Sequence, residues 1–107
     1  MAWHVVASTT DLDGRNVIGV TVLGRKIAVY RIGAEFYATS NVCTHQHAIL
    51  SDGEVVDGFI ECPIHYGLFE IFSGKAQGAP VCIDLEVLPV RVDGTGILVD
   101  VGSDPAP

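Results

Sequence analysis

The sequence predicts an all-β fold built from antiparallel sheets. Hydrophobic residues make up 49% of the 107-residue chain, valine and isoleucine are prominent among them, and 12 glycines are spread along it. This combination is typical of short strands joined by tight turns. No segment keeps a helical period of hydrophobic residues over more than about ten positions. The length predicts a single domain, residues 1–107.

Three strands are expected in the first 40 residues, after a short apolar start at 5–8. The alternating stretch KIAVYRI predicts a strand that pairs as a hairpin with the apolar stretch NVIGVTVL. Glycine-containing segments between the apolar stretches predict turns. One helical turn near residues 8–12 is the only helix in this prediction. The predicted strands are 16–23, 26–32 and 36–39, with turns at Gly24-Arg25 and Gly33-Ala34-Glu35.

Two further hairpins and one additional strand are expected in the second half. Asp57-Gly58 is a strong signal for a two-residue hairpin turn, and Ser73-Gly74 predicts the end of a strand. Pro89 should mark an edge position or a bulge, because proline cannot donate a ladder hydrogen bond. The predicted strands are 53–56, 59–61, 68–72, 84–92 and 97–101.

Two short segments pair a cysteine with a histidine. Cys43 and His45 are separated by one residue, Cys62 and His65 by two, and 16 residues lie between the pairs. The flanking strands place both pairs in turns at hairpin ends. Two such turns side by side would bring four ligand atoms together, with the hairpin at 53–61 as the spacer.

Thiolate and imidazole ligands suit either a tetrahedral zinc ion or an iron–sulfur centre. Structural zinc sites more often group cysteine with cysteine and histidine with histidine, whereas each segment here mixes the two types. Mixed segments fit a [2Fe–2S] centre with two cysteines on one iron and two histidines on the other. A zinc-binding interaction module remains the alternative from the residues alone.

The pattern Cys43-x-His45 and Cys62-x-x-His65 resembles the Rieske cluster signature. The resemblance covers most of the chain, including Ser51-Asp52-Gly53 and the turn Gly78-Ala79-Pro80, and is closest to small Rieske ferredoxins of bacterial ring-hydroxylating dioxygenases. It implies a Rieske-like fold with an inserted cluster-binding subdomain at about 41–80. In the family a proline-bearing loop covers the cluster.

The resemblance also implies one [2Fe–2S] cluster, with Cys43 and Cys62 on the inner iron and His45 and His65 on the outer one. The implied function is one-electron transfer from a flavin-dependent NAD(P)H reductase to a terminal oxygenase that hydroxylates an aromatic substrate. Such a chain is an electron-transfer component and not itself an enzyme. A Rieske carrier for a different redox partner is a second alternative.

Several differences from other Rieske branches favour a soluble electron carrier over a respiratory Rieske protein or a terminal oxygenase. Respiratory Rieske proteins resemble this chain but add a disulfide between the two loops, and the matching positions here are Ala48 and Ile64. We expect no counterpart of their membrane anchor in this protein, and none of the catalytic domain of terminal oxygenases. His47 is interpreted as a surface histidine and Cys82 as a small buried hydrophobe, so neither is an expected ligand.

The formal net charge of −7 restricts the kinds of partner that this chain is expected to bind. It argues against nucleic acid, whose phosphates would repel the chain. It suits docking on a basic patch of a partner protein, although the same charge would also serve solubility alone. No apolar run reaches the roughly 20 residues of a membrane helix, and no secretory signal is found. A cytoplasmic location is therefore expected, and a monomer is expected because a one-electron carrier needs no larger assembly.

Overall fold

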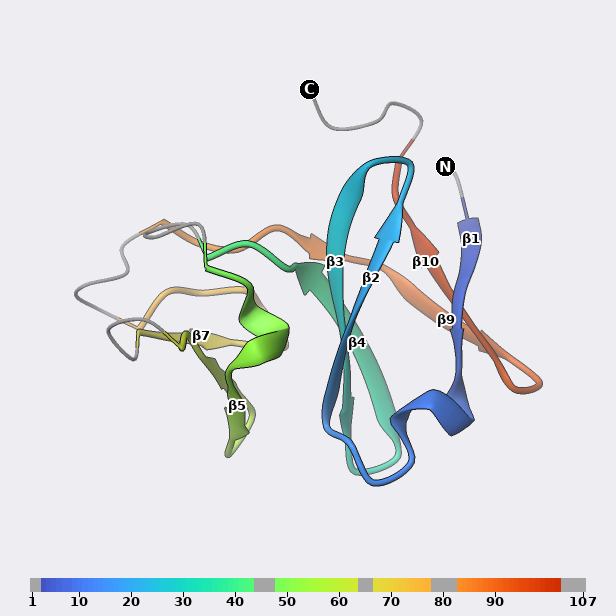
Figure 1. Cartoon of the computed structure of the whole chain (residues 1–107), viewed down its shortest axis with the longest axis horizontal. Helices are drawn as coiled ribbons and strands as arrows, with labels where there is room; N and C mark the ends of the chain where they lie inside the picture. Colours follow the sequence, from blue (N-terminus) through green and yellow to red (C-terminus); the bar gives the residue numbers. More distant parts are fainter. Residues whose placement is uncertain (1–2, 44–47, 64–66, 78–82, 103–107) are drawn as a thin grey trace.

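The computed structural model describes residues 3–43, 48–63, 67–77 and 83–102, and it contains three antiparallel sheets (Figure 1). We name them the end sheet, the central sheet and the small sheet. The end sheet has the order β1 (Trp3–Ser8), β10 (Gly96–Asp100), β9 (Val90–Asp93). The central sheet has the order β2 (Val17–Val22), β3 (Arg25–Ile32), β4 (Glu35–Ser40), β8 (Val87–Leu88). The small sheet has the order β5 (Glu54–Val56), β6 (Phe59–Glu61), β7 (Leu68–Glu70).

These sheets confirm the predicted all-β fold of antiparallel sheets. Two short 3-10 helices accompany them, η1 (Thr9–Leu12) and η2 (Leu50–Asp52), and the first confirms the helical turn expected near residues 8–12. Ser8 caps η1 by accepting a hydrogen bond from the Thr10 amide, while Asp11 accepts from the Ser8 amide. In the described ranges, no helix has the length and apolar character needed to cross a membrane.

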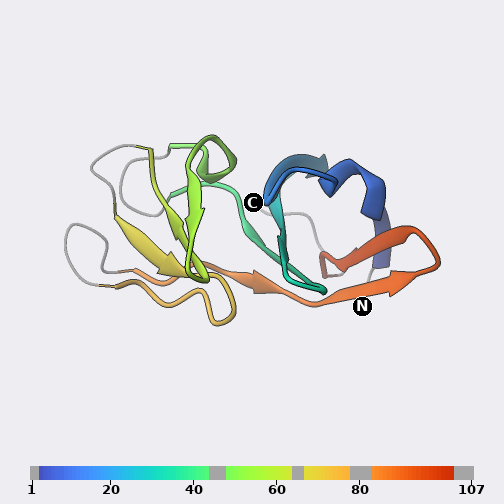
Figure 2. The same cartoon turned by 90° about the horizontal axis from the view of Figure 1, so that it is seen from below.

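The central sheet stands between the other two sheets. Figure 1 shows the small sheet on one side of β2, β3 and β4 and the end sheet on the other, and Figure 2 shows the same two lobes from below. Strand β3 is the shared wall. Its residues Ala28 and Tyr30 belong to the core toward the small sheet, whereas Ile27 and Val29 belong to the core toward the end sheet. Successive strand residues point to opposite faces, so one apolar strand can serve both cores.

Two of the two-residue hairpin turns have positive φ at both central residues. Asp57 and Gly58 have φ of 49° and 84°, which confirms the turn predicted there. The first hairpin turns at Leu23 and Gly24, with φ of 52° and 79°, because Val22 pairs directly with Arg25. The prediction of Gly24-Arg25 was therefore wrong by one residue. Leucine rarely adopts a left-handed conformation, and the sequence pattern therefore favoured Gly24-Arg25 over Leu23-Gly24 as the turn residues.

Two predicted strands in the second half are shorter than expected. Strand β7 ends at Glu70, because the Gly74 amide donates to the Glu70 carbonyl at 2.7 Å and closes a turn over residues that were expected to extend to 72. The predicted strand 84–92 divides into β8 and β9 at Pro89. Strand β8 pairs with β4 and strand β9 with β10, so the chain changes sheets at this proline. Figure 2 shows this segment running from the small-sheet lobe to the end sheet.

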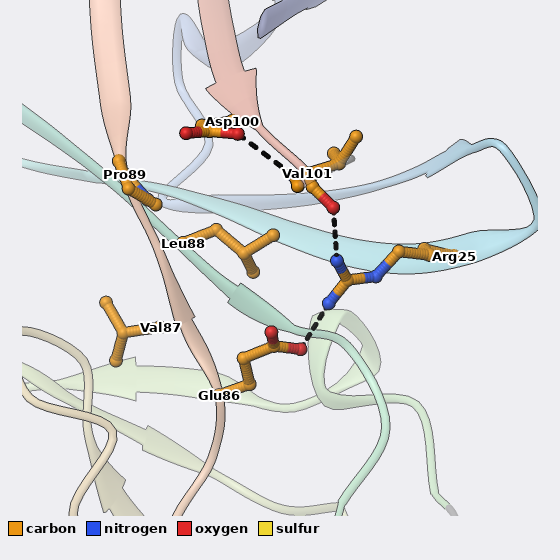
Figure 3. Close-up of a pocket in the computed structure, with 8 residues that line it drawn as sticks. Arg25, Glu86, Val87, Leu88, Pro89, Asp100 and Val101 are labelled. Carbon is orange, nitrogen blue, oxygen red and sulfur yellow. Dashed lines mark hydrogen bonds and ion pairs between the residues drawn. The ribbon is translucent and has the colours of Figure 1, made fainter. Parts of the chain in front are cut away.

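Arg25 joins three segments near this change of sheets. One terminal nitrogen donates to the Val101 carbonyl at 2.7 Å, and the other forms an ion pair with Glu86 (Figure 3). Leu88 and Pro89 line an open pocket of about 360 Å³ beside these groups. The start of β3, the segment entering β8 and the end of β10 are thus tied together by one side chain.

Candidate metal centre

Cys43 and Cys62 occupy equivalent positions in two hairpin connections of the same length. The Cys43 amide donates to the Ala48 carbonyl at 2.8 Å, and the Cys62 amide donates to the Gly67 carbonyl at 2.8 Å. Each cysteine is preceded by one member of an antiparallel pair that closes the connection. These pairs are Val42 with Ile49 and Glu61 with Leu68. We call the two connections, 43–48 and 62–67, the cysteine hairpins.

The structure brings both cysteines into one core. Each is 1% exposed, and both belong to the packed group between the central and small sheets. Leu50, Ile60 and Phe69, each fully buried, belong to the same group. Two thiols from hairpins 19 positions apart in the sequence therefore share a single apolar environment.

Several predicted site residues lie outside the described residues. His45 and His65 are among them, so their role as ligands stays a prediction. His47, Cys82 and the turn Gly78-Ala79-Pro80 lie there as well. Within the described ranges, no three histidine, cysteine, aspartate or glutamate residues come together as a metal site, and the two cysteines are the only predicted ligands that the structure places.

Asn41 supports the first cysteine hairpin and was missed by the sequence analysis. It is 4% exposed, and its amide group bonds to Ser51 through both ends: Oδ1 accepts from the Ser51 amide at 2.8 Å, and Nδ2 donates to Ser51 Oγ at 2.9 Å. The signal available in the sequence was Gly19. A glycine inside a strand pattern indicates close approach by another group, and here that group is the Asn41–Ser51 pair.

Tyr30 is fully buried in the core that contains the two cysteines. Thr39 Oγ1 donates to the Ser40 carbonyl at 2.8 Å, so the Tyr30 hydroxyl, 2.8 Å from Thr39 Oγ1, is the donor in the second hydrogen bond. Burial raises the pKa of Tyr30 well above its ordinary value. The phenol is therefore a neutral packing group and not an acid or base at neutral pH.

The two buried thiols fit a metal–sulfur centre. A metal ion lowers the pKa of a coordinating thiol and stabilises the thiolate, which an apolar core would otherwise disfavour. Soft thiolates select zinc, copper(I) or iron–sulfur clusters. The apolar surroundings exclude water and act on the reduction potential of a redox centre. The donor set, two cysteines placed at matching positions, suits one iron of a [2Fe–2S] centre.

Comparison with known proteins agrees with this geometry. The Rieske [2Fe-2S] domain family matches residues 2–89. The ferredoxin component of the naphthalene 1,2-dioxygenase system from Pseudomonas putida is 39% identical over 98 residues, which are 92% of this chain and 94% of that protein.

Two solved structures share the fold. The ferredoxin of carbazole 1,9a-dioxygenase from Nocardioides aromaticivorans IC177 has a TM-score of 0.85 at 33% identity, over 92% of this chain and 97% of that one. A ferredoxin chain in a complex of reduced oxygenase and oxidised ferredoxin of carbazole 1,9a-dioxygenase has a TM-score of 0.84 at 36% identity, over 91% of each chain. One Rieske-type [2Fe–2S] cluster is therefore the cofactor. The chain belongs to the Rieske [2Fe-2S] domain family.

Proposed function

We propose that this chain carries single electrons from a flavin-dependent NAD(P)H reductase to the terminal oxygenase of an aromatic ring-hydroxylating dioxygenase. It is the electron-transfer component of such a system and not its catalytic subunit. The observation that carries the proposal is the pair of buried cysteines at matching positions of two equal hairpins, in a chain that resembles ferredoxin components along nearly its whole length.

We assign the ligands as Cys43 and Cys62 on the inner iron and His45 and His65 on the outer iron. Each cysteine hairpin would then contribute one ligand of each type. The region of about 41–80, which contains both hairpins and the small sheet, is the cluster-binding subdomain in this proposal. With two thiolates and two neutral imidazoles, the oxidised cluster is near neutral and accepts one electron at a higher potential than an all-cysteine cluster does.

The residues around the cysteines prepare the site for this chemistry. The core that surrounds them excludes water, and the two backbone hydrogen bonds that close the hairpins hold Cys43 and Cys62 at fixed positions. A site that is already held in place needs little rearrangement when its charge changes, which favours fast electron transfer.

The charge of the chain is concentrated around the proposed site. Residues 41–86 contain seven carboxylates and one lysine, a net charge of −6, whereas the rest of the chain contains six carboxylates and five basic residues, a net charge of −1. The carboxylates of the small sheet include Glu54, Glu61 and Glu70. We call residues 41–86 the cluster-bearing lobe. Such asymmetry favours docking of this lobe on a basic partner surface, because complementary potentials steer the encounter of two proteins.

The oxygenase and the reductase are the proposed partners. A related ferredoxin has been seen in complex with its oxygenase, which supports the first of them. The reductase follows from the need for a supplier of single electrons, because this chain has no nucleotide-binding glycine motif before a helix. We propose that the carrier works as a monomer in the cytoplasm, where NAD(P)H is available to that reductase.

Ligand substitutions with matched controls test the proposal. Purified protein should contain about two irons and two acid-labile sulfides per chain, and the reduced protein should show an EPR spectrum with the low average g value of histidine ligation. Cys43→Ser, Cys62→Ser, His45→Ala and His65→Ala should each abolish or alter that spectrum. Cys82→Ser and His47→Ala are the controls and should leave it unchanged.

Two results would overturn the assignment. A protein that binds zinc and contains no inorganic sulfide would be an interaction module. A control variant that loses the spectrum, with the matching ligand variant unaffected, would move the ligand to the control position. Electron flow is then tested by supplying NAD(P)H, a flavin reductase and a terminal oxygenase, and measuring whether product formation requires this chain.

A further inference from the structure

Residues 50–53, which comprise η2 and Gly53, lie in the connection between the two cysteine hairpins, before β5 and β6; we call these four residues the spacer segment. We infer that the spacer segment sets the distance between the two cysteine hairpins, with Asn41 and Gly53 as positioning residues at its two ends. The inference rests on the ligand role proposed for Cys43 and Cys62. It is carried by hydrogen bonds and close backbone contacts at both ends of the segment.

At its first end the spacer segment is fixed to Asn41, two residues before Cys43. The Leu50 amide donates to the Asn41 carbonyl at 2.8 Å, and the Asn41 side chain makes its two hydrogen bonds to Ser51. The Asn41 amide donates to the Lys26 carbonyl of β3 at 2.9 Å. Asn41 therefore connects the start of the first hairpin, the start of the spacer segment and the central sheet.

The backbone of β2 packs closely against the Asn41 end of the spacer segment. An ideal Cβ added at Gly19 would lie 2.7 Å from Asn41 Nδ2 and 2.7 Å from Ser51 Oγ. Real Cβ atoms do not approach polar atoms so closely, so the pair is seated directly on the strand. Since the Asn41–Ser51 pair rests on a paired strand of the central sheet, it cannot sink further toward that sheet.

At its second end the spacer segment touches the residue before Cys62. A Cβ at Gly53 would lie 1.9 Å from the Glu61 carbonyl oxygen and 3.2 Å from the Leu50 carbonyl oxygen. Gly53 has φ of −89° and ψ of −161°, an extended conformation open to any residue. The glycine is therefore required by the close contact with Glu61 and not by the backbone conformation.

Burial prevents the spacer segment from swinging away from the site. Leu50 on the segment and Ile60 on β6 are both fully buried in the core that holds the two cysteines. The first hairpin, the spacer segment and the second hairpin thus form one continuous series of contacts. A displacement at either end must change the separation of Cys43 and Cys62.

Gly53→Ala tests the inference, with Gly58→Ala as its matched control. Gly58 lies in the nearby β5–β6 turn at φ of 84° with open space around it, so alanine there introduces backbone strain but no collision. We expect Gly53→Ala to shift the visible circular dichroism and the EPR g values of the reduced protein. It should also lose iron to a chelator on the order of tenfold faster, as is typical when support around metal ligands is removed. Gly58→Ala should lower the thermal midpoint with unchanged spectra.

Asn41→Ala is the second variant and decides the matter if Gly53→Ala does not fold. It releases Ser51 and should change the spectra in the same way. Wild-type spectra in whichever of these variants fold would overturn the inference, as would equal spectral changes in Gly58→Ala. These results leave the proposed function standing, because that proposal is tested separately, by the iron and sulfide content of the wild-type protein, by the ligand variants and by electron flow to the oxygenase.

Discussion

Glu54 and Glu61 lie directly opposite each other across the β5–β6 hairpin, so two carboxylates share one face of the small sheet immediately before Cys62. Glu54 is exposed and Glu61 is partly exposed. Like charges directly opposite each other in a sheet are destabilising, by an amount on the order of 0.2–1 kcal/mol. Keeping this pair beside the proposed cluster is consistent with a role in docking.

Glu54→Gln should therefore stabilise the folded protein. Removing one of the facing charges relieves repulsion of about 0.5 kcal/mol, which corresponds to a rise in the thermal midpoint of about 2–4 °C for a domain of this size. The measurement is a thermal scan of the cluster-loaded protein at low ionic strength. The same scan in high salt should show a smaller difference, and an equal difference in both would point to a cause other than charge.

The same substitution should slow association with a basic partner. Steering by the whole charge distribution supplies about 10- to 1,000-fold in association rate, so one carboxylate should account for a loss of less than about tenfold. Stopped-flow mixing of the reduced carrier with its oxygenase at low salt measures the rate. Glu35→Gln on β4 is the control, since Glu35 is an exposed carboxylate outside residues 41–86. Equal slowing by both variants would contradict docking through the cluster-bearing lobe.

The sequence predicted the parts of this fold that depend on local chemistry. The Asp57-Gly58 hairpin follows from turn geometry, and the structure has it. The missing proline N–H predicted an irregularity at Pro89, although the sequence pattern did not predict that the strand would divide there between two sheets. The positions of Cys43 and Cys62 at hairpin ends were likewise predictable, because strand patterns flank them. Features that depend only on a few neighbouring residues can be predicted from the sequence pattern.

Features that depend on distant segments were not predictable. Asn41 follows a strand, where an asparagine usually begins an exposed turn, and only the approach of Ser51 and Gly19 explains its burial. The early end of β7 depends on a turn that competes with strand pairing; it is closed by the local hydrogen bond from Gly74 to Glu70 and is also held by the Leu85 amide, which donates to the Gly74 carbonyl at 2.7 Å. The apolar sequence LFEIF favours a longer strand and contains no sign of that competition.

Thr39→Val should destabilise the protein more than Tyr30→Phe does. Tyr30→Phe removes a donor, while the Thr39 hydroxyl keeps its bond to the Ser40 carbonyl, so the cost should be about 0.5–1.5 kcal/mol. Thr39→Val removes the partner of the buried Tyr30 hydroxyl, at a cost of about 1–3 kcal/mol. Denaturant unfolding of the loaded protein measures both. When the two substitutions are combined, the total loss of stability should be smaller than the sum of the two single losses. Additive losses would contradict the hydrogen bond.

Tyr30 should also make stability fall in alkali. Its pKa in the folded protein is raised by burial, whereas in the unfolded chain it ionises near its ordinary value of about 10. The unfolded state then loses a proton that the folded state keeps, so the contribution is present below about pH 10 and is lost as the pH rises further. The thermal midpoint of Tyr30→Phe relative to wild type should be constant up to about pH 9 and should rise above pH 10. A constant difference across this range would contradict the assignment.

Arg25→Met should destabilise the protein more than Glu86→Gln does, although both remove the ion pair in Figure 3. The Glu86 side chain is 59% exposed, and an exposed pair contributes about 0–1 kcal/mol. The Arg25 side chain is only 13% exposed and also donates to the carbonyl of Val101, which is 2% exposed. Loss of that donor leaves the buried Val101 carbonyl without this hydrogen bond, which should cost about 1–3 kcal/mol of stability.

Thermal midpoints of the two variants separate these contributions. The methionine keeps most of the arginine stem, so the loss in Arg25→Met reports the missing hydrogen bonds more than missing packing. High salt should reduce the small effect of Glu86→Gln and leave most of the effect of Arg25→Met, because the carbonyl contact is partly buried. If Glu86→Gln costs as much as Arg25→Met, the ion pair to the segment before β8, and not the carbonyl contact after β10, supplies most of the stabilisation by Arg25.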